Sequence, residues 1–503
     1  MMTETNPPKN IIIVGGGTAG WMAASILMQS LGKYGSKITL IESDNVPVIG
    51  VGEGTTPLFK QFLHYLNIPE HEFMSKCNAT YKHGISFPDW TQDDEEFSDY
   101  FHPFNSPGYN HNDDVFFSNC NKRRNKQQVD TDSKNYFFGA ELAKQRKAPV
   151  GPSPLNSDNI GYAYHFDASL LAELLKGRCL KEGITHIVDD VTKVALNKQQ
   201  DITQLVLTND KIISGDFFID CTGFARKLIK EALNVKLTSY ENKLFNNSAV
   251  VIRTPTSSDE ITPYTESRAL KNGWAWRIPL SDRVGWGYVY SNNYTSAQEA
   301  EQELRELIGT TSNDLLARHI NFKVGRVNEH WKNNCFAVGL SQGFIEPLEA
   351  TALGLVQFGL IRFVSYFDKG NYQPTYRDHF NKIVNEAFDS TCEYIQMHYK
   401  LNTREDSQYW CDNRDNSHIS DSSRTLIAGW DSSQVDFNDV LAQHSNTSTY
   451  PPYSWYCILS GMGRYPKETK KGLPANNENP FQKEVSRYYG HREFLTSGLY
   501  NDI

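Results

Sequence analysis

Hydrophobic positions near the N-terminus predict a strand, a tight turn, a helix and a second strand. Residues 11–14 form a continuous apolar run, as in a strand that is buried on both faces. A glycine-rich stretch follows at 15–20, then a helical pattern at 21–31 and a second apolar run at 37–42. Two strands joined through a helix are typical of parallel neighbours, so the chain opens as a doubly wound α/β fold.

The same kind of pattern extends along most of the chain. A helix followed by a strand is predicted over 164–188, and strand patterns recur at 204–222, 244–252 and 274–291. An amphipathic helix is predicted over 349–367, because apolar side chains recur there every three to four residues. From about residue 370 onward the pattern is mainly helical. We therefore predict a core domain with a mixed β-sheet at 1–370 and a mainly helical C-terminal region at 371–503.

Residues 88–160 interrupt this regular pattern. They contain an acidic run at 93–96 and the basic triplet Lys122, Arg123 and Arg124, with polar and aromatic residues between them. We predict that this segment leaves the sheet. A run of like charges is usually solvated, so we expect the triplet to lie on the surface.

Composition and charge exclude several classes of protein. The chain has 503 residues, of which 39 % are hydrophobic, and its formal net charge is −9. A mildly acidic chain argues against binding to nucleic acids or anionic membranes, because both need a basic surface. The first residues contain no apolar run long enough for a signal peptide or a membrane span, so we expect a cytoplasmic protein. Eight scattered cysteines without a C-x-x-C pair predict neither a metal site nor a disulfide framework.

The glycine-rich turn is the first candidate binding site. Gly15, Gly17 and Gly20 match G-x-G-x-x-G between a strand and a helix, the context in which this motif binds a dinucleotide. Glu42 ends the next strand, where a carboxylate can accept hydrogen bonds from ribose hydroxyls. The turn alone does not separate FAD from NAD. A distant apolar strand with small residues at 335–343, including Gly339, favours FAD, since monooxygenase-type flavoproteins close their FAD site with such a segment.

Four segments together resemble the tryptophan-halogenase family of flavin-dependent halogenases. They are W-A-W-R-I-P at 274–279, the glycine turn with Trp21 after it, T-Y-K-H-G-I at 80–85, and F-I-E-P-L-E-A-T at 344–351. The resemblance implies a Rossmann-like FAD domain of the monooxygenase type. It also implies an enzyme that receives reduced FAD from a separate flavin reductase. Reduced FAD, O₂ and chloride or bromide then give hypohalous acid, which halogenates a small aromatic substrate.

The resemblance assigns roles to residues around this chemistry. Lys82 would direct the hypohalous acid onto the substrate ring, either as a haloamine or as a hydrogen-bond donor. Glu349 would orient the halogenating species and take up the ring proton, with Glu346 as a competitor that the Pro-Leu-Glu spacing does not favour. Thr351 and Ala352 begin the amphipathic helix, and the N–H groups of a helix start suit a halide ion.

Aromatic residues would separate the flavin from the substrate and hold the substrate ring. Trp274 and Trp276 lie two apart on one strand face and would form the screen. His102 and Phe104 would stack on one face of the substrate and Trp455 on the other. Residues 445–450 offer no counterpart of the Tyr-Tyr pair and Glu that bind free tryptophan, so an indole-like or other electron-rich ring fits better. The mainly helical C-terminal region would then cover the substrate.

Two other functions fit parts of the same pattern. An FAD-dependent aromatic hydroxylase would insert oxygen without a halide, and a non-catalytic flavin-binding protein would reoxidise its flavin regardless of halide. The tryptophan pair and Lys82 favour the halogenase. The sequence is compatible with a monomer or a homodimer.

Overall fold

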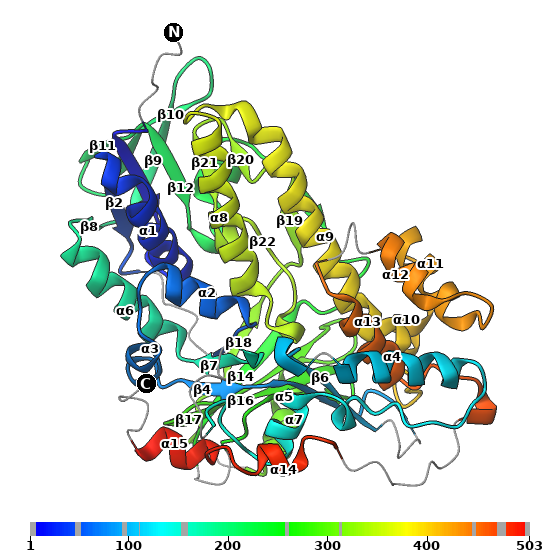
Figure 1. Cartoon of the computed structure of the whole chain (residues 1–503). Helices are drawn as coiled ribbons and strands as arrows, with labels where there is room; N and C mark the ends of the chain where they lie inside the picture. The colour runs from blue at the N-terminus through cyan, green and yellow to red at the C-terminus, as the bar shows by residue number, and fades with distance from the viewer. Residues whose placement is uncertain are drawn as a thin grey trace.

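In the residues that it describes, the computed structural model contains two large sheets, three small ones and a set of long helices (Figure 1). It describes residues 7–45, 52–92, 98–109, 111–151, 159–256, 261–310, 314–444, 449–469 and 479–497. In the described residues, the predicted class of an α/β protein with a mixed sheet and a helical C-terminal part is confirmed.

The first sheet carries the predicted nucleotide turn. Its strand order is β20-β21-β12-β1-β2-β8, and all neighbours are parallel except the edge pair β20–β21. The strands are β1 (Asn10–Val14), β2 (Lys37–Glu42), β8 (Thr185–Val188), β12 (Phe217–Asp220), β20 (Trp331–Lys332) and β21 (Cys335–Ala337). The distant strand β21 therefore lies next but one to β1, which brings the predicted second FAD segment to the glycine turn.

Residues 11–14 of β1 are all apolar because each face of the strand packs against a different layer. Ile11 and Ile13 belong to the main core with α1 (Thr18–Leu31). Ile12 and Val14 belong to a second core, which they share with β9 (Val191–Leu196) and β10 (Ile202–Leu207). Further helices around α1 are α6 (Ala168–Lys181) and α8 (Ala352–Lys369).

The second sheet carries the predicted substrate-side residues. Its order is β18-β14-β17-β16-β15-β5-β6, antiparallel except for the pair β15–β5. The strands are β5 (Gly84–Pro88), β6 (Asp99–Pro103), β14 (Ser248–Pro255), β15 (Thr265–Leu270), β16 (Gly273–Pro279), β17 (Arg283–Tyr290) and β18 (Arg318–Asn321). A small antiparallel sheet adjoins it. Its strands, in spatial order, are β3 (Glu53–Gly54), β7 (Ala163–Phe166) and β4 (Thr80–Lys82), and Lys82 is the last residue of β4.

Helices dominate the described residues beyond 370. They include α9 (Arg377–Leu401), α10 (Gln408–Asp415), α11 (Asp421–Asp431), α12 (Phe437–His444), α13 (Pro452–Gly461), α14 (Gln482–Val485) and α15 (His491–Ser497). The red helices α14 and α15 return to the N-terminal half of the chain (Figure 1), where the Tyr81 N–H donates to His491 Nε2 at 3.0 Å. The division at residue 370 stays a prediction.

The basic triplet is not the exposed patch that the charge pattern predicts. It ends α4 (His111–Arg124), and the side chains of Arg123 and Arg124 are 0 % and 4 % exposed. Arg124 donates to the carbonyl oxygens of Gly429 and Trp430 at 2.6 and 2.7 Å. These arginines therefore join the 88–160 segment to the C-terminal helices. The prediction of a solvated patch is wrong for both of them, while Lys122 is exposed as predicted.

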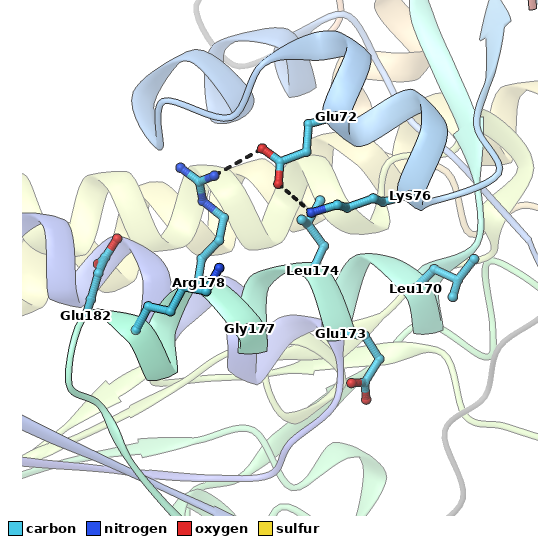
Figure 2. A pocket seen from close by; sticks show the side chains of 9 residues that line it. Glu72, Lys76, Leu170, Glu173, Leu174, Gly177, Arg178 and Glu182 are labelled. Atoms are coloured by element: carbon cyan, nitrogen blue, oxygen red, sulfur yellow. Dashed lines mark hydrogen bonds and ion pairs between the residues drawn. The ribbon is translucent and has the colours of Figure 1, made fainter.

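Two further features concern the helices of the fold and its surface. In the described part of the chain, no helix is both long enough and apolar enough to cross a membrane. A surface groove of about 540 Å³ lies between α3 (Glu70–Lys76) and α6, where Glu72 bridges Lys76 and Arg178 (Figure 2). None of the predicted site residues lines this groove.

Candidate active site

The glycine turn after β1 has the shape that a dinucleotide needs. Gly15 has a φ of +114°, and a Cβ there would lie 2.1 Å from the carbonyl oxygen of Cys221. A Cβ on Gly20 would lie 1.9 Å from the carbonyl oxygen of Gly15, so these two positions exclude a side chain. A Cβ on Gly17 would instead have no atom within 4 Å. The turn is thus closed toward the protein and open at the N-terminus of α1, the place where turns of this kind bind a pyrophosphate in dinucleotide-binding folds.

Glu42, the last residue of β2, and Gly339, two residues beyond β21, both meet this turn. A Cβ on Gly16 would lie 2.3 Å from the carboxyl carbon of Glu42, so the glutamate crosses the turn directly. The carboxylate has His186 Nε2 at 2.8 Å and Lys176 Nζ at 3.4 Å. Gly339 has a φ of +70°, and a Cβ there would lie 2.6 Å from Cβ of Ala19 in α1. These residues fit FAD, and the structure brings all of them to one end of the first sheet.

Lys82 is a fully buried amine at the end of β4. Its side chain is 0 % exposed, and Nζ donates to the carbonyl oxygen of Thr55 at 3.3 Å. Nζ also lies 5.5 Å from the ring centroid of Phe104. Burial lowers the pKa of Lys82 to about 7, although the negative charge of Glu349 opposes this shift. An appreciable fraction of the amine is therefore uncharged near neutral pH.

Gly54 lies between Lys82 and the residues predicted to bind the halide. A Cβ on Gly54 would lie 3.1 Å from Lys82 Nζ and 3.3 Å from Cβ of Ala350. Ala350 has a left-handed φ of +55°, and Thr351 follows it as the N-cap of α8, which begins at Ala352. The first N–H groups of a helix have no partner within the helix. The helix start and the lysine therefore face each other across one glycine.

Glu349 is buried between two histidines. It ends a short 3₁₀ helix (Pro347–Glu349), and His102 Nδ1 lies 3.0 and 3.2 Å from its two carboxylate oxygens. On its other side, His398 Nε2 lies 3.1 Å from Oε1. Burial opposes ionisation, but the charges and hydrogen bonds of the two histidines outweigh it and lower the pKa of Glu349 to about 2. Glu349 is therefore a stable anion within electrostatic range of Lys82.

Glu346, the competing glutamate, belongs to a different network. It is 0 % exposed and accepts hydrogen bonds from Asn246 Nδ2 at 2.9 Å and from Trp274 Nε1 at 3.1 Å, and from the hydroxyl of Tyr399. Burial raises its pKa above the usual value. Its contacts hold the Trp274 indole in place, so the two glutamates have distinct surroundings.

Trp274 and Trp276 form a continuous aromatic wall on β16. Their ring centroids are 6.0 Å apart and both side chains are buried. The Trp276 ring crosses the neighbouring strand at Gly287, where a Cβ would lie 2.0 Å from the ring. The wall therefore depends on a glycine in β17 as well as on its own two residues.

The predicted substrate-side residues are only partly brought together. Phe104 lies beside Lys82, while the His102 ring is held between Glu349 and Ser454 Oγ, with Nε2 2.9 Å from the hydroxyl. Trp455 is buried against Tyr394 and His444, at centroid distances of 4.9 and 4.7 Å.

Sequence reasoning missed several neighbours of this site. The ring of Tyr453 lies 5.8 Å from that of His102, and Tyr394 donates its hydroxyl proton to the Ser454 carbonyl at 3.0 Å. The position of Trp455 in the sequence pointed to the right segment, α13, but not to the side chains of that segment that face His102. Residues 445–448, which bear on the predicted lack of a head-group site, lie outside the described residues.

A doubly wound sheet, an open glycine turn and a buried lysine near an ionised glutamate define a flavoprotein of the monooxygenase type. The chain belongs to the tryptophan halogenase family, whose sequence profile matches residues 10–478. It is a flavin-dependent halogenase that uses reduced FAD from a separate reductase. The hydroxylase and the non-catalytic flavoprotein are not favoured.

Individual relatives agree with this assignment over almost the whole chain. The tryptophan 6-halogenase SttH of Streptomyces toxytricini is 35 % identical over 520 residues, which cover 99 % of this chain and 97 % of the relative. The tryptophan 7-halogenase RebH of Lentzea aerocolonigenes is 32 % identical, with 91 % and 90 % covered. The SttH crystal structure matches with a TM-score of 0.83 and 33 % identity over 98 % of this chain and all of that one. The halogenase BrvH of Brevundimonas sp. BAL3 matches with the same TM-score and 30 % identity, over 98 % of both chains.

Proposed function

We propose that this enzyme halogenates an indole-like or another electron-rich aromatic ring, with Lys82 and Glu349 as its catalytic residues. The observation that carries this proposal is the pairing of a fully buried amine with a buried carboxylate that two histidines keep ionised. Surface lysines and glutamates do not need such an arrangement. Perturbed titratable groups of this kind gather at catalytic sites.

Different residues of the chain would have different roles in this reaction. The turn at Gly15, Gly17 and Gly20, with Glu42 and Gly339, would hold FAD, which when reduced supplies hypohalous acid from O₂ and a halide. Trp274 and Trp276 would keep the organic substrate away from that chemistry. Lys82 would receive the hypohalous acid and direct it onto the ring, as a haloamine or as a hydrogen-bond donor.

Glu349 would assist by accepting the proton that the ring loses. The cation formed when a halogen adds to an aromatic ring is strongly acidic, so even a carboxylate with a low pKa can take its proton. The same negative charge would stabilise that cation in a site from which water is excluded.

The halide would bind at the start of α8. The N–H groups after Thr351, beginning with Ala352, and the positive end of the helix dipole suit chloride or bromide. Bromide is easier to oxidise than chloride, so bromination is the easier reaction to detect.

The substrate would stack against His102 and Phe104, with the aromatic segment around Trp455 on its other side. Named relatives act on tryptophan or 7-chloro-L-tryptophan. Residues 445–450 of this chain read S-N-T-S-T-Y, which provides neither a tyrosine pair nor a carboxylate for an amino-acid head group. We therefore expect an indole ring without that head group to be preferred.

A competition assay tests this substrate class. Equal concentrations of indole and tryptophan are supplied with FAD, a flavin reductase, NADH, O₂ and bromide, and both brominated products are quantified by mass spectrometry. We expect brominated indole to exceed brominated tryptophan by at least about tenfold. The head group of tryptophan would lack polar partners in the site, and one or two such lost contacts change the rate by about this factor. Preferential bromination of tryptophan would overturn the proposed substrate class but not the halogenase activity.

The pH dependence of halogenation should report the state of Lys82. Its pKa of about 7 and that of Glu349, about 2, are far apart, so of these two groups only the lysine titrates near neutrality. If the uncharged amine receives the halogen, product formation should rise with pH through about 7 and then level off. Single turnovers with photoreduced FAD measure this without the reductase, and a rate independent of pH between 6 and 8 would contradict it.

We also propose that the enzyme is cytoplasmic. Its partner would be a flavin reductase, which supplies reduced FAD by diffusion. All eight cysteines are free thiols, as expected in a reducing compartment.

A further inference from the structure

Among the described residues, the ion-pair partners of Glu349 are two histidines and not Lys82. His102 and His398 both lie within 3.2 Å of its carboxylate oxygens. The amine of Lys82 instead donates to the backbone of Thr55. His398 comes from the middle of α9, far from every motif in the sequence, and it is 0 % exposed.

The contacts of His398 determine how many protons its ring carries. Its Nδ1 lies 3.2 Å from the carbonyl oxygen of Tyr394, which can only accept, so Nδ1 must carry a proton. Its Nε2 lies 3.1 Å from Oε1 of Glu349, an ion-pair distance, although the two atoms are not aligned for a hydrogen bond. A bare lone pair there would repel the carboxylate. Both nitrogens are therefore protonated, which makes the ring a cation.

His102 does not need a positive charge. Its Nδ1 faces Glu349, but its Nε2 faces the hydroxyl of Ser454 at 2.9 Å. A hydroxyl can donate as well as accept, so a neutral His102 satisfies both contacts. The contacts of His102 are thus satisfied by a neutral or a charged ring, whereas those of His398 require the charged ring.

Aromatic rings enclose His398 on its remaining sides. The ring centroids of Phe87 and Trp90 lie at 4.8 and 5.7 Å, and those of Tyr394 and Tyr100 at 5.4 and 6.2 Å. Burial raises the pKa of both tyrosines well above the usual value, so they stay neutral. An aromatic enclosure favours a cation.

Glu349 is also the carboxylate that faces this enclosure. The neighbouring acid, Glu346, is directed toward Trp274 and toward Tyr399, the residue that follows His398 in α9. The histidine therefore has one anionic partner among the described groups around it.

We propose that His398 is a positioning residue whose positive charge neutralises Glu349, so that Lys82 can act as an uncharged amine. This inference rests on the roles proposed above for Lys82 and Glu349. Without His398, Glu349 would keep only His102 as an ion-pair partner, and more of its negative charge would act on Lys82. Lys82, surrounded by the Phe104 ring, the Thr55 carbonyl and the buried His165, would then hold its proton more tightly.

The test is the pH profile of His398→Gln in single turnovers with photoreduced FAD, bromide and an arene. Glutamine keeps a donor for Glu349 but no charge. We expect the pH at which bromination reaches half its maximum to rise by about one unit, because one unit corresponds to a tenfold change in proton affinity. At pH 7 the variant should brominate several-fold more slowly than the wild type and recover most of its rate at pH 9.

His379→Gln is the matched control. His379 lies in the same helix, is exposed, and contacts the Tyr366 hydroxyl at 3.0 Å, so the wild-type profile should persist. A rate of His398→Gln that falls by the same factor at every pH would show a merely structural role and overturn the inference. A wild type that forms no halogenated arene would instead refute the assigned roles of Lys82 and Glu349.

A second measurement does not depend on how the variant folds. The wild-type protein is labelled with ¹⁵N-histidine, and its ring nitrogens are observed by NMR at pH 7. We expect a histidine with both nitrogens protonated and slowly exchanging, as for a buried imidazolium. The absence of any such buried imidazolium would overturn the inference.

Discussion

Replacement of Lys82 by methionine is expected to abolish halogenated product while FAD binding and flavin reoxidation persist. The amine is fully buried, near Glu349 and beside Phe104, so no other side chain can take its place. Product formation should fall by about 1,000-fold or more, the usual range for loss of a principal catalytic group. Mass spectrometry of the arene and the rate of flavin reoxidation, measured together, check this.

The same variant should be more stable than the wild type at neutral and lower pH. The pKa of Lys82 is about 7 in the folded state and 10.5 as a model amine, so the unfolded chain binds more protons between these values. The buried lysine therefore costs stability on the order of 5 kcal/mol below pH 7, and this cost declines as the pH rises toward 10.5.

Lys76→Met is a suitable control for the lysine variant. Lys76 is exposed and forms a surface ion pair with Glu72, so its loss should change neither turnover nor melting temperature appreciably. Near-normal halogenation by Lys82→Met would remove Lys82 from the catalytic residues.

Replacement of Gly17 by valine is expected to prevent FAD binding without unfolding the protein. A Cβ at this position meets no atom within 4 Å, so the protein itself accommodates the side chain. The valine would occupy the space through which a pyrophosphate reaches the N-terminus of α1. We expect FAD affinity to fall by about 100-fold or more, as for a lost set of charge-assisted hydrogen bonds.

Fluorescence titration with FAD measures this change, and circular dichroism checks the fold. Gly177→Val in α6 is a matched control, because its Cβ also meets no atom within 4 Å and it lies in the groove of Figure 2, apart from the turn. An FAD affinity of Gly17→Val within threefold of the wild type would place the dinucleotide elsewhere.

Local sequence predicted the nucleotide half of the molecule well. The strand at 37–42 matches β2 to the residue, and the strand at 11–14 and the helix at 21–31 begin within a few residues of β1 and α1. These elements follow from hydrophobic periodicity and a glycine turn, which act over short distances along the chain. The confirmed family resemblance likewise rests on short motifs.

The surroundings of the candidate catalytic residues could not be predicted in the same way. His102 and Glu349 are 247 residues apart, and His102 and Ser454 are 352 apart, so only the folded chain shows their contacts. His398 lies in an ordinary amphipathic helix and has no motif around it. The prediction that Arg124 is exposed to solvent was wrong for a related reason. The carbonyl groups that accept its hydrogen bonds lie about 300 residues away in the sequence, so the local pattern does not show them.

The central claim is tested most directly by a reaction under ¹⁸O₂. The protein, FAD, a flavin reductase, NADH and bromide are incubated with a panel of indoles and phenols, and the products are analysed by mass spectrometry. The account predicts a product that carries the bromine isotope doublet and no ¹⁸O, and that is absent without bromide or with Lys82→Met. An ¹⁸O-labelled, bromine-free arene formed equally well without bromide would contradict it.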